Sequence, residues 1–207
     1  MKKVAVINYG IGNIGSIINM CKKIDVETIE VQNADDLKQA ERIILPGVGS
    51  FDHGMSKLHE LGLDEAIKKA VLVDKKPLLG ICLGMQLLGN KSEEGRWSGL
   101  GLIDFHCKKF KFDNDLELKI PHMGWDVVEF NKDDDVLLSD IKNQQRYYFV
   151  HSYYAVCEKE ENCLMTCDYE KKFVAVVKKN NIYGVQFHPE KSHQFGMKLL
   201  KNFVEKV

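Results

Sequence analysis

Cys82 stands between two glycines where an apolar run gives way to a helical pattern. The run over residues 77–81 is typical of a buried strand, and the apolar spacing from Leu83 to Leu88 is typical of a helix. Gly80 and Gly84 lie two residues before and after the cysteine, the spacing of a nucleophile elbow. A helix N-terminus at this point would favour a thiolate and an oxyanion. Cys82 is therefore the candidate nucleophile, and a buried core cysteine is the simpler alternative.

His188 and Glu190 form a second candidate element near the end of the chain. They follow a predicted strand over residues 182–187, and a spacing of two would place both side chains on one side of it. A histidine that takes a proton from a thiol needs an orienting carboxylate, which Glu190 can supply. A structural histidine is the alternative for His188 alone.

Residues 46–49 (Pro-Gly-Val-Gly) form the third element and follow another predicted strand, at residues 42–45. Glycines let the backbone approach a ligand, so the segment could offer N–H groups to an oxyanion, or could be only a flexible turn. Carboxyl ends of parallel strands carry the sites of open α/β sheets. Because all three elements follow strands, we predict that they meet as a Cys-His-Glu hydrolytic site.

The first seventy residues alternate strand and helix patterns, which requires parallel strands joined by crossover helices. Strands are expected at 4–7, 28–31, 42–45 and 77–82, and helical segments at 13–24, 35–40, 55–61 and 64–73. Short strand-like runs follow at 103–105, 116–120, 127–130, 147–150 and 173–177, and a helix at 196–207 closes the chain. We predict an α/β fold: an open, mostly parallel sheet with helices on both faces and antiparallel extensions, forming one domain over residues 1–207.

Composition excludes several classes of function. The 207 residues carry a net charge of −1, which gives no nucleic-acid footprint and no polybasic membrane contact. No apolar stretch is long enough to span a bilayer and no signal peptide opens the chain, so we expect a cytoplasmic protein. Six cysteines are too few for a secreted disulfide scaffold and lack the spacing of a zinc site. We predict free thiols and no metal.

Gly10-Ile11-Gly12-Asn13-Ile14-Gly15 matches the G-x-G-x-x-G string of dinucleotide-binding enzymes. It follows a predicted strand, opens a helix with Asn13 as a plausible N-cap, and precedes an acidic residue, Glu30. An oxidoreductase is thus an alternative of another class. We favour an ordinary glycine-rich turn, because a lone string of this kind is weak and the Cys-His-Glu pattern is better specified. The polar stretch 90–98, with Glu93 and Glu94, is expected to be a solvated loop.

The chain resembles the class I (triad) glutamine amidotransferases. The resemblance is carried by Gly80-Ile81-Cys82-Leu83-Gly84-Met85-Gln86 and His188-Pro189-Glu190, and it covers nearly the whole chain. Within that family, the motifs at 8–13, 45–49, 121–125, 148–153 and 187–192 are most similar to the glutaminase subunits of imidazole glycerol phosphate synthases. The resemblance implies that Cys82 attacks the glutamine side-chain amide, that His188 acts as base and then acid, and that Glu190 orients it. No cofactor is implied.

The resemblance also implies two sets of contact residues. Those expected at the substrate are Gly47, Val48, Gly49, Leu83, Gln86, His151, Ser152 and Tyr153. The implied partner is a (β/α)8-barrel cyclase that receives the ammonia through a tunnel and makes imidazole glycerol phosphate in histidine biosynthesis. The residues expected to contact it are Asn13, Met123, Trp125, Tyr148 and Lys191. Related subunits that supply ammonia for amidation of a surface-polysaccharide sugar share the triad and are the alternative. One position departs from the pattern: Asp126 stands where the family usually has Asn.

Overall fold

Alternate residues of the first strand, β1 (Lys3–Ile7), pack into two different hydrophobic cores. Val4 and Val6 belong to one core, and Ala5 and Ile7 to the other. A strand that is buried on both faces needs a cover on each side of its sheet. The computed structural model, which describes residues 3–112 and 119–207, supplies both covers.

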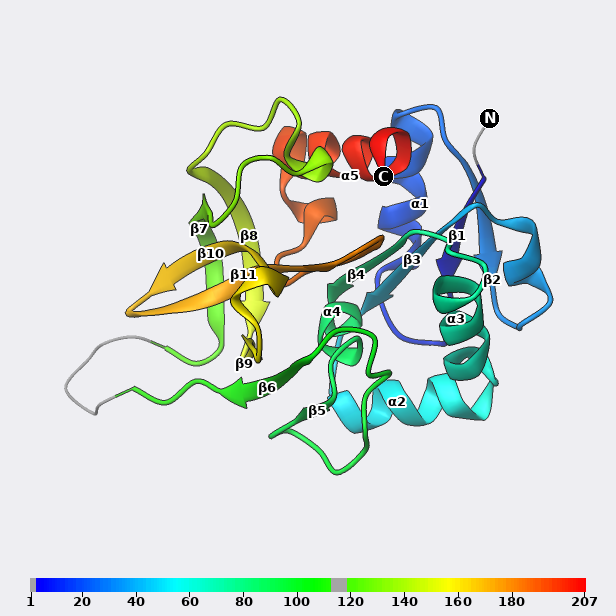
Figure 1. Ribbon diagram of the computed structural model, residues 1–207, viewed down its shortest axis with the longest axis horizontal. Helices are drawn as coiled ribbons and strands as arrows, with labels where there is room; N and C mark the ends of the chain where they lie inside the picture. Colours follow the sequence, from blue (N-terminus) through cyan, green and yellow to red (C-terminus); the bar gives the residue numbers. More distant parts are fainter. Residues whose placement is uncertain (1–2, 113–118) are drawn as a thin grey trace.

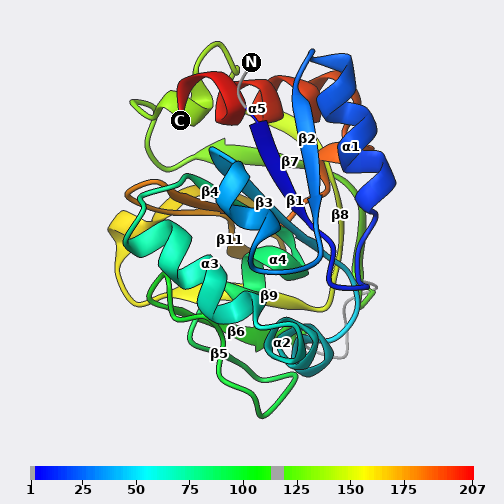
Figure 2. The same cartoon turned by 90° about the vertical axis from the view of Figure 1, so that its right-hand side faces the viewer.

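Helices cover the two faces of the parallel strands (Figures 1 and 2). On one face lie α1 (Ile14–Lys23) and α5 (His193–Lys206). On the other face lie α2 (Phe51–Glu60) and α3 (Leu63–Leu72). Their apolar stripes fill the cores, because helical spacing of three and four residues gathers these side chains on one side of each helix. Ile17 and Leu199 pack into the first core, and Leu58 and Ile67 into the second.

Five neighbouring strands of the sheet run parallel. Their order is β2 (Glu27–Val31), β1, β3 (Arg42–Gly47), β4 (Leu78–Cys82) and β12 (Ile182–Val185). In register, Gly47 lies opposite Cys82, and Val185 lies opposite Ile81. The carboxyl ends of β3, β4 and β12 therefore meet at one edge of the sheet, as the sequence predicts for the three candidate elements.

The sheet continues beyond β12 with antiparallel strands β11 (Lys171–Lys179), β10 (Cys163–Tyr169), β7 (His122–Phe130) and β8 (Gln145–His151). A branch adds β9 (Tyr153–Cys157), β6 (Phe105–Lys109) and the two-residue β5 (Lys91–Ser92). The remaining short elements are α4 (Leu83–Leu87), η1 (Asp36–Gln39), η2 (Val136–Leu138), η3 (Glu160–Asn162) and η4 (Pro189–Lys191). The predicted parallel sheet with helices on both faces and antiparallel extensions is confirmed.

Several predicted boundaries differ from the structure. The helix expected at 55–61 begins earlier, at Phe51, and the strand expected at 103–105 begins only at Phe105. The strand expected to reach residue 187 ends at Val185. Of the strand expected at 116–120, residues 116–118 lie outside the described residues, and 119–120 are not in a strand.

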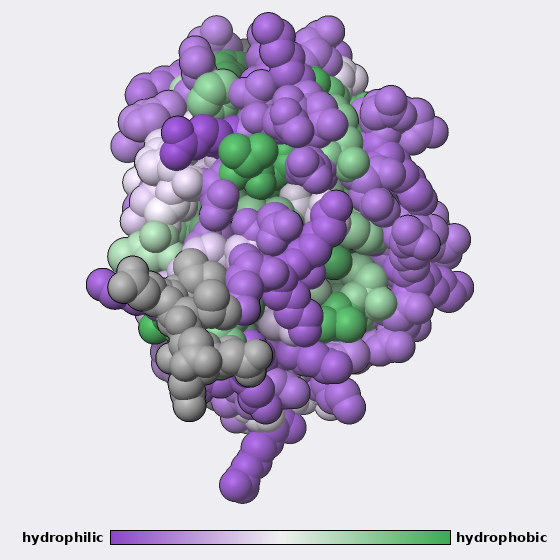
Figure 3. Space-filling view, turned by 90° about the vertical axis from the view of Figure 1, so that its left-hand side faces the viewer, coloured by the Kyte–Doolittle hydropathy of each residue, from purple (hydrophilic) through white to green (hydrophobic). Residues whose placement is uncertain are grey.

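Within the described ranges, no helix is both long and apolar enough to cross a membrane. Figure 3 shows the end of the molecule that lies on the left in Figure 1. Hydrophilic side chains dominate this face, and apolar side chains appear between them in small separate groups.

Candidate active site

The turn at Cys82 joins β4 to α4 without a connecting loop. Cys82 has φ 53° and ψ −109°, a conformation that side-chain-bearing residues rarely adopt. The close packing around the turn leaves no room for side chains on either flank. A Cβ on Gly84 would overlap the Leu45 carbonyl oxygen, and a Cβ on Gly80 would lie 2.6 Å from the Gly84 carbonyl oxygen. The predicted sharp turn is confirmed, and backbone strain of this kind is typical of functional sites.

His188 and Glu190 form a buried pair beside this turn. The distance from His188 Nδ1 to Glu190 Oε1 is 2.7 Å, and their side chains are 1% and 4% exposed. The predicted reason for their proximity, period-two alternation in a strand, is wrong because β12 ends three residues earlier. The two side chains meet instead because the η4 turn begins directly after His188.

Two further hydrogen bonds fix the backbone at His188. Its N–H donates to the Tyr148 carbonyl oxygen at 2.8 Å. The Ser192 hydroxyl donates to the His188 carbonyl oxygen at 2.6 Å and accepts from the Tyr148 N–H at 3.0 Å. The imidazole thus stands on a turn that is anchored to β8, which belongs to the antiparallel part of the sheet.

The electrostatic environment of His188 favours its charged form. Burial lowers the pKa of His188, but the Cys82 thiol and the Glu190 carboxylate outweigh burial and raise it from 6.5 to about 10. The Glu190 carboxylate is hydrogen-bonded to His188 Nδ1, whereas His188 Nε2 has no hydrogen-bond partner among the described residues. The ring can therefore offer Nε2 for proton exchange with the thiol.

Cys82 and His188 line the same cavity, which has a volume of about 290 Å³. Seven of the eight predicted substrate residues line it with them: Val48, Gly49, Leu83, Gln86, His151, Ser152 and Tyr153. The eighth, Gly47, lies beside Cys82 at the end of β3. A Cβ on Gly47 would lie 2.5 Å from the Tyr9 hydroxyl oxygen, so Gly47 is closely packed against Tyr9. The structure thus brings together the elements that the sequence predicts at one site.

Gln86 lines the cavity, but its amide nitrogen is already engaged. It donates to the Tyr153 carbonyl oxygen at 3.2 Å and to Gln186 Oε1 at 3.0 Å. Gln186 is fully buried, and its Nε2 lies 3.8 Å from Cys82 Sγ. Sequence reasoning missed Gln186, although a polar residue inside an apolar strand-like run is a usable signal, because buried amides need partners.

Glu94 also lines the cavity, contrary to the expectation of a solvated loop. Its carboxylate accepts a hydrogen bond from the Phe51 N–H, at the start of α2, at 2.8 Å. Burial raises the pKa of Glu94, and the Asp52 charge adds to this effect. Pro121 and Val150 also line the cavity, although they are not among the predicted substrate residues.

The glycine string at 10–15 forms the turn between β1 and α1. Gly10 and Gly12 have φ of 83° and 115°, and Asn13 caps α1 by accepting from the Ser16 N–H at 3.4 Å. The Glu30 carboxylate accepts from the side chains of Asn8 and Gln32 at 2.5 and 3.2 Å. The turn packs against the 46–47 segment, since a Cβ on Gly12 would be 3.5 Å from that backbone. Gly10 and Gly12 are thus used in the structure of the turn, which agrees with the favoured interpretation of an ordinary glycine-rich turn.

Three of the predicted partner residues lie together near the η4 turn. The Trp125 and Tyr148 rings are 6.2 Å apart, and Lys191 Nζ lies 5.5 Å from the Tyr148 ring centre. Met123, two residues before Trp125 on β7, is 61% exposed. Asn13 is exposed at the start of α1, which contacts η4. Their role at a partner surface stays a prediction.

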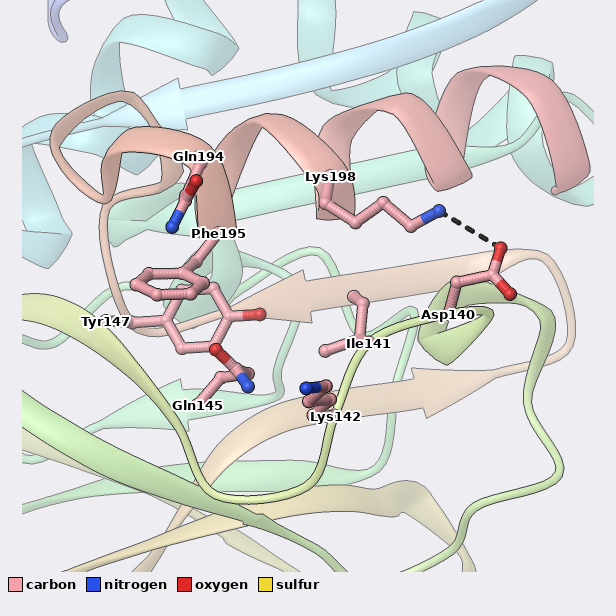
Figure 4. A pocket seen from close by; sticks show the side chains of 8 residues that line it. All are labelled: Asp140, Ile141, Lys142, Gln145, Tyr147, Gln194, Phe195 and Lys198. Atoms are coloured by element: carbon pink, nitrogen blue, oxygen red, sulfur yellow. Dashed lines mark hydrogen bonds and ion pairs between the residues drawn. The ribbon is translucent and has the colours of Figure 1, made fainter.

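A somewhat larger cavity of about 360 Å³ lies between the start of β8 and α5 (Figure 4). Phe195 and Tyr147 lie close together there, and Lys198 forms an ion pair with Asp140 at 3.1 Å. Its lining contains no thiol and no imidazole among the described residues. The smaller cavity at Cys82 is therefore the candidate active site.

Comparisons with known proteins agree with this geometry. The family model "Glutamine amidotransferase class-I" matches residues 5–207. A Methanococcus maripaludis protein, "Imidazole glycerol phosphate synthase subunit HisH 2", is 54% identical over 99% of this chain and 100% of its own length. A Pseudomonas aeruginosa protein of the same name is 47% identical, with the same coverage.

Solved structures show the same fold at low sequence identity. "Structure of PurLQS from Thermotoga maritima" aligns with a TM-score of 0.76 and 19% identity, over 98% of this chain and 97% of that one. At that identity the likeness concerns the fold alone. Because the family model matches almost all of the sequence and full-length relatives exceed 40% identity, the chain belongs to the class-I glutamine amidotransferase family.

Proposed function

We propose that this chain is the glutaminase subunit of an imidazole glycerol phosphate synthase in histidine biosynthesis. The observation that carries the proposal is the cavity in which a cysteine on a strained turn adjoins a buried His-Glu pair. The names of the full-length relatives support this pathway over amidation of a surface sugar. The extent of the family match also supports a single amidotransferase domain over 1–207.

The proposed reaction begins at the sulfur. The Cys82 thiolate attacks the side-chain amide carbon of glutamine, and the oxygen becomes an oxyanion that backbone N–H groups near Gly49 and Leu83 stabilise. Protonated His188 gives its proton to the leaving nitrogen, so ammonia departs and a glutamyl thioester remains. His188 then takes a proton from water, which attacks the thioester and releases glutamate and the thiolate. Glu190 holds the imidazole in the required orientation throughout.

The ammonia is proposed to reach a (β/α)8-barrel cyclase subunit docked at the surface of Met123, Trp125, Tyr148, Lys191 and Asn13. An aromatic pair beside an exposed cation is typical of residues that contribute strongly to protein interfaces.

The six cysteines are free thiols, which supports a reducing compartment such as the cytoplasm.

The test is glutamine turnover in the complex of this chain with a barrel cyclase from the same source. Cys82→Ser should lower turnover by roughly a thousandfold or more while leaving association unchanged, because the removed sulfur supplies only the chemistry. The matched control is Cys157→Ser, which changes a half-buried thiol outside the cavity and should retain normal turnover. In the same assay, Lys191→Glu should weaken association more than it slows the chemistry.

Turnover that survives in Cys82→Ser would refute the mechanism. Normal association of Lys191→Glu with the cyclase would refute the placement of the partner surface.

A further inference from the structure

A chain of hydrogen bonds leads from Asp126 to the wall of the active-site cavity. His122 on β7 lies opposite His151 on β8 in the register of the two strands. His122 Nε2 is 3.2 Å from Asp126 Oδ2, and His122 Nδ1 is 3.1 Å from His151 Nε2. His151 Nδ1 is 2.8 Å from the Tyr153 carbonyl oxygen. Both imidazoles are buried, at 2% and 6% exposed.

The partners at the two ends of the chain determine how many protons it holds. The Tyr153 carbonyl only accepts, so His151 Nδ1 carries a hydrogen. An ionised Asp126 also only accepts, so His122 Nε2 carries another, and the contact between the rings needs a third. Two neutral imidazoles supply only two. The three contacts therefore require one additional proton, on a histidine or on the carboxyl group, which then donates to His122.

The surroundings place this additional proton at the Asp126 end. Burial, together with positive charge on His122 and His188, lowers the pKa of His151 from 6.5 to about 3. Burial also lowers the pKa of His122 below 6.5, but there the Asp126 carboxylate opposes the shift by its charge and its hydrogen bond. The additional proton is thus favoured in the contact between His122 and Asp126, which lies farther along the chain of hydrogen bonds from the catalytic histidine.

Other titratable and charged groups also face this pair. From β10, the Tyr169 ring stacks on His122 at 4.0 Å, and Cys167 interacts with the Asp126 charge. Burial raises the pKa of Cys167, so the thiol stays neutral. From β8, Arg146 donates to the carbonyl oxygen of Trp125, the residue before Asp126, at 3.4 Å. None of these groups replaces a bond in the chain.

The hydrogen bonds of His151 and Tyr153 at the cavity wall continue to the residues near Cys82. The Tyr153 carbonyl oxygen also accepts from Gln86, and Gln86 bonds to Gln186, whose amide lies 3.8 Å from Cys82 Sγ. His151 and Tyr153 both line the cavity. A shift of the His151 ring would therefore change the shape of the cavity next to the nucleophile.

We propose that Asp126 and His122 are positioning residues, which hold His151 and the Tyr153 wall of the substrate cavity through one shared proton. The inference rests on the proposed function, in which this cavity binds glutamine. Loss of the proton as the pH rises breaks one of the three bonds and loosens the wall. The result is weaker glutamine binding with little change in the chemical step.

Asp126→Asn is the discriminating variant. An Asn amide can donate to His122 Nε2, which completes the chain with two neutral rings and needs no additional proton. In the wild-type complex, KM for glutamine should rise about fivefold as pH increases through the titration of His122, whose pKa is lowered below 6.5. In Asp126→Asn that rise should be absent, and kcat should follow the wild-type profile. The matched control is Asp64→Asn, which alters another His-Asp contact, His59 with Asp64, outside the cavity.

Nitrogen-15 NMR of histidine-labelled protein provides a readout that does not depend on turnover. Doubly protonated His122, or a proton shared with Asp126, is expected in the wild type and should be lost in Asp126→Asn. A neutral His122 with one N–H in the wild type at acidic pH would overturn the proposal, and so would identical KM profiles for wild type and Asp126→Asn. Absence of turnover in the wild-type complex would refute the proposed function instead, and the NMR result would still decide the state of the proton.

Discussion

The parallel and antiparallel parts of the sheet position the active site in different ways. In the parallel part, backbone geometry places the reactive groups at the ends of β3, β4 and β12, where glycines occupy positions without room for a Cβ. In the antiparallel part, side-chain hydrogen bonds hold the cavity wall. Changes in the first part should therefore affect chemistry or folding directly, whereas changes in the second should adjust the shape of the cavity.

The difference has a physical cause. Each of β3, β4 and β12 is hydrogen-bonded to a strand on both sides, so the backbone at their carboxyl ends is held from two directions. Among the residues that the structure describes, the edge strand β8 is bonded to a strand on one side only, namely β7. Its position depends more on side chains, including an aromatic cluster in which Phe149 stacks on His122 at 4.9 Å.

The largest effect in this comparison is expected for Glu190→Gln, on the turn that follows the parallel strand β12. The carboxylate and the thiol together hold the pKa of His188 near 10, so the imidazolium is retained far above pH 6.5. Removal of the carboxylate lowers that pKa and lets the amide stabilise the wrong tautomer. Glutamine turnover should fall by about a thousandfold, and the alkaline limb of its pH profile should move to lower pH.

The stability of this variant should change in a defined direction. Because the folded-state pKa of His188 is raised, its charged form stabilises the wild type fully below about pH 6.5, and this contribution is lost as pH rises toward 10. Measured by urea unfolding across this range, the free energy of unfolding of Glu190→Gln should depend less on pH than that of the wild type. An unchanged alkaline limb would mean that Glu190 does not set the charge of His188.

The second-largest effect is expected for Gly84→Ala. This variant tests whether close backbone packing determines the sharp turn at Cys82. The added methyl group would overlap the Leu45 carbonyl oxygen on β3, so β3 and α4 must separate. The free energy of unfolding should fall by about 3 kcal/mol, measured by urea denaturation. Gly15→Ala is the matched control, since no atom lies within 4 Å of the added Cβ and the site is helical. Equal stability of the two variants would contradict the packing argument.

The smallest effect is expected in the antiparallel part, at Tyr147→Phe on β8. The Tyr147 hydroxyl is buried without a hydrogen-bond partner among the described residues. Its removal should raise the free energy of unfolding by about 1 kcal/mol, because an unsatisfied buried hydroxyl destabilises the folded state.

The comparison for that variant is Tyr183→Phe on β12. The Tyr183 hydroxyl donates to Asp135 Oδ1 at 3.3 Å, so its loss should lower stability by a similar amount, about 1 kcal/mol. Thermal unfolding of the two variants should show shifts of opposite sign. A destabilised Tyr147→Phe would indicate that the hydroxyl has a partner, such as an ordered water.

The parallel core and the triad could be predicted from the sequence by itself. Alternating strand and helix patterns require parallel strands, and reactive residues that follow such strands must share an edge of the sheet. The glycines around Cys82 predict the elbow because few other residues permit so close an approach. The elbow is local, so spacing along the chain is sufficient to find it, whereas the triad follows from the rule that neighbouring parallel strands end at the same edge.

Only the tertiary structure decided what surrounds the triad. The His188–Glu190 contact depends on a turn after β12, and the role of Glu94 depends on α2, which starts more than forty residues earlier. The contact of His122 with His151 arises from the pairing of β7 with β8, which strand patterns alone do not specify. Cross-strand register brings distant residues together, and a shift of one position would turn either side chain to the opposite face.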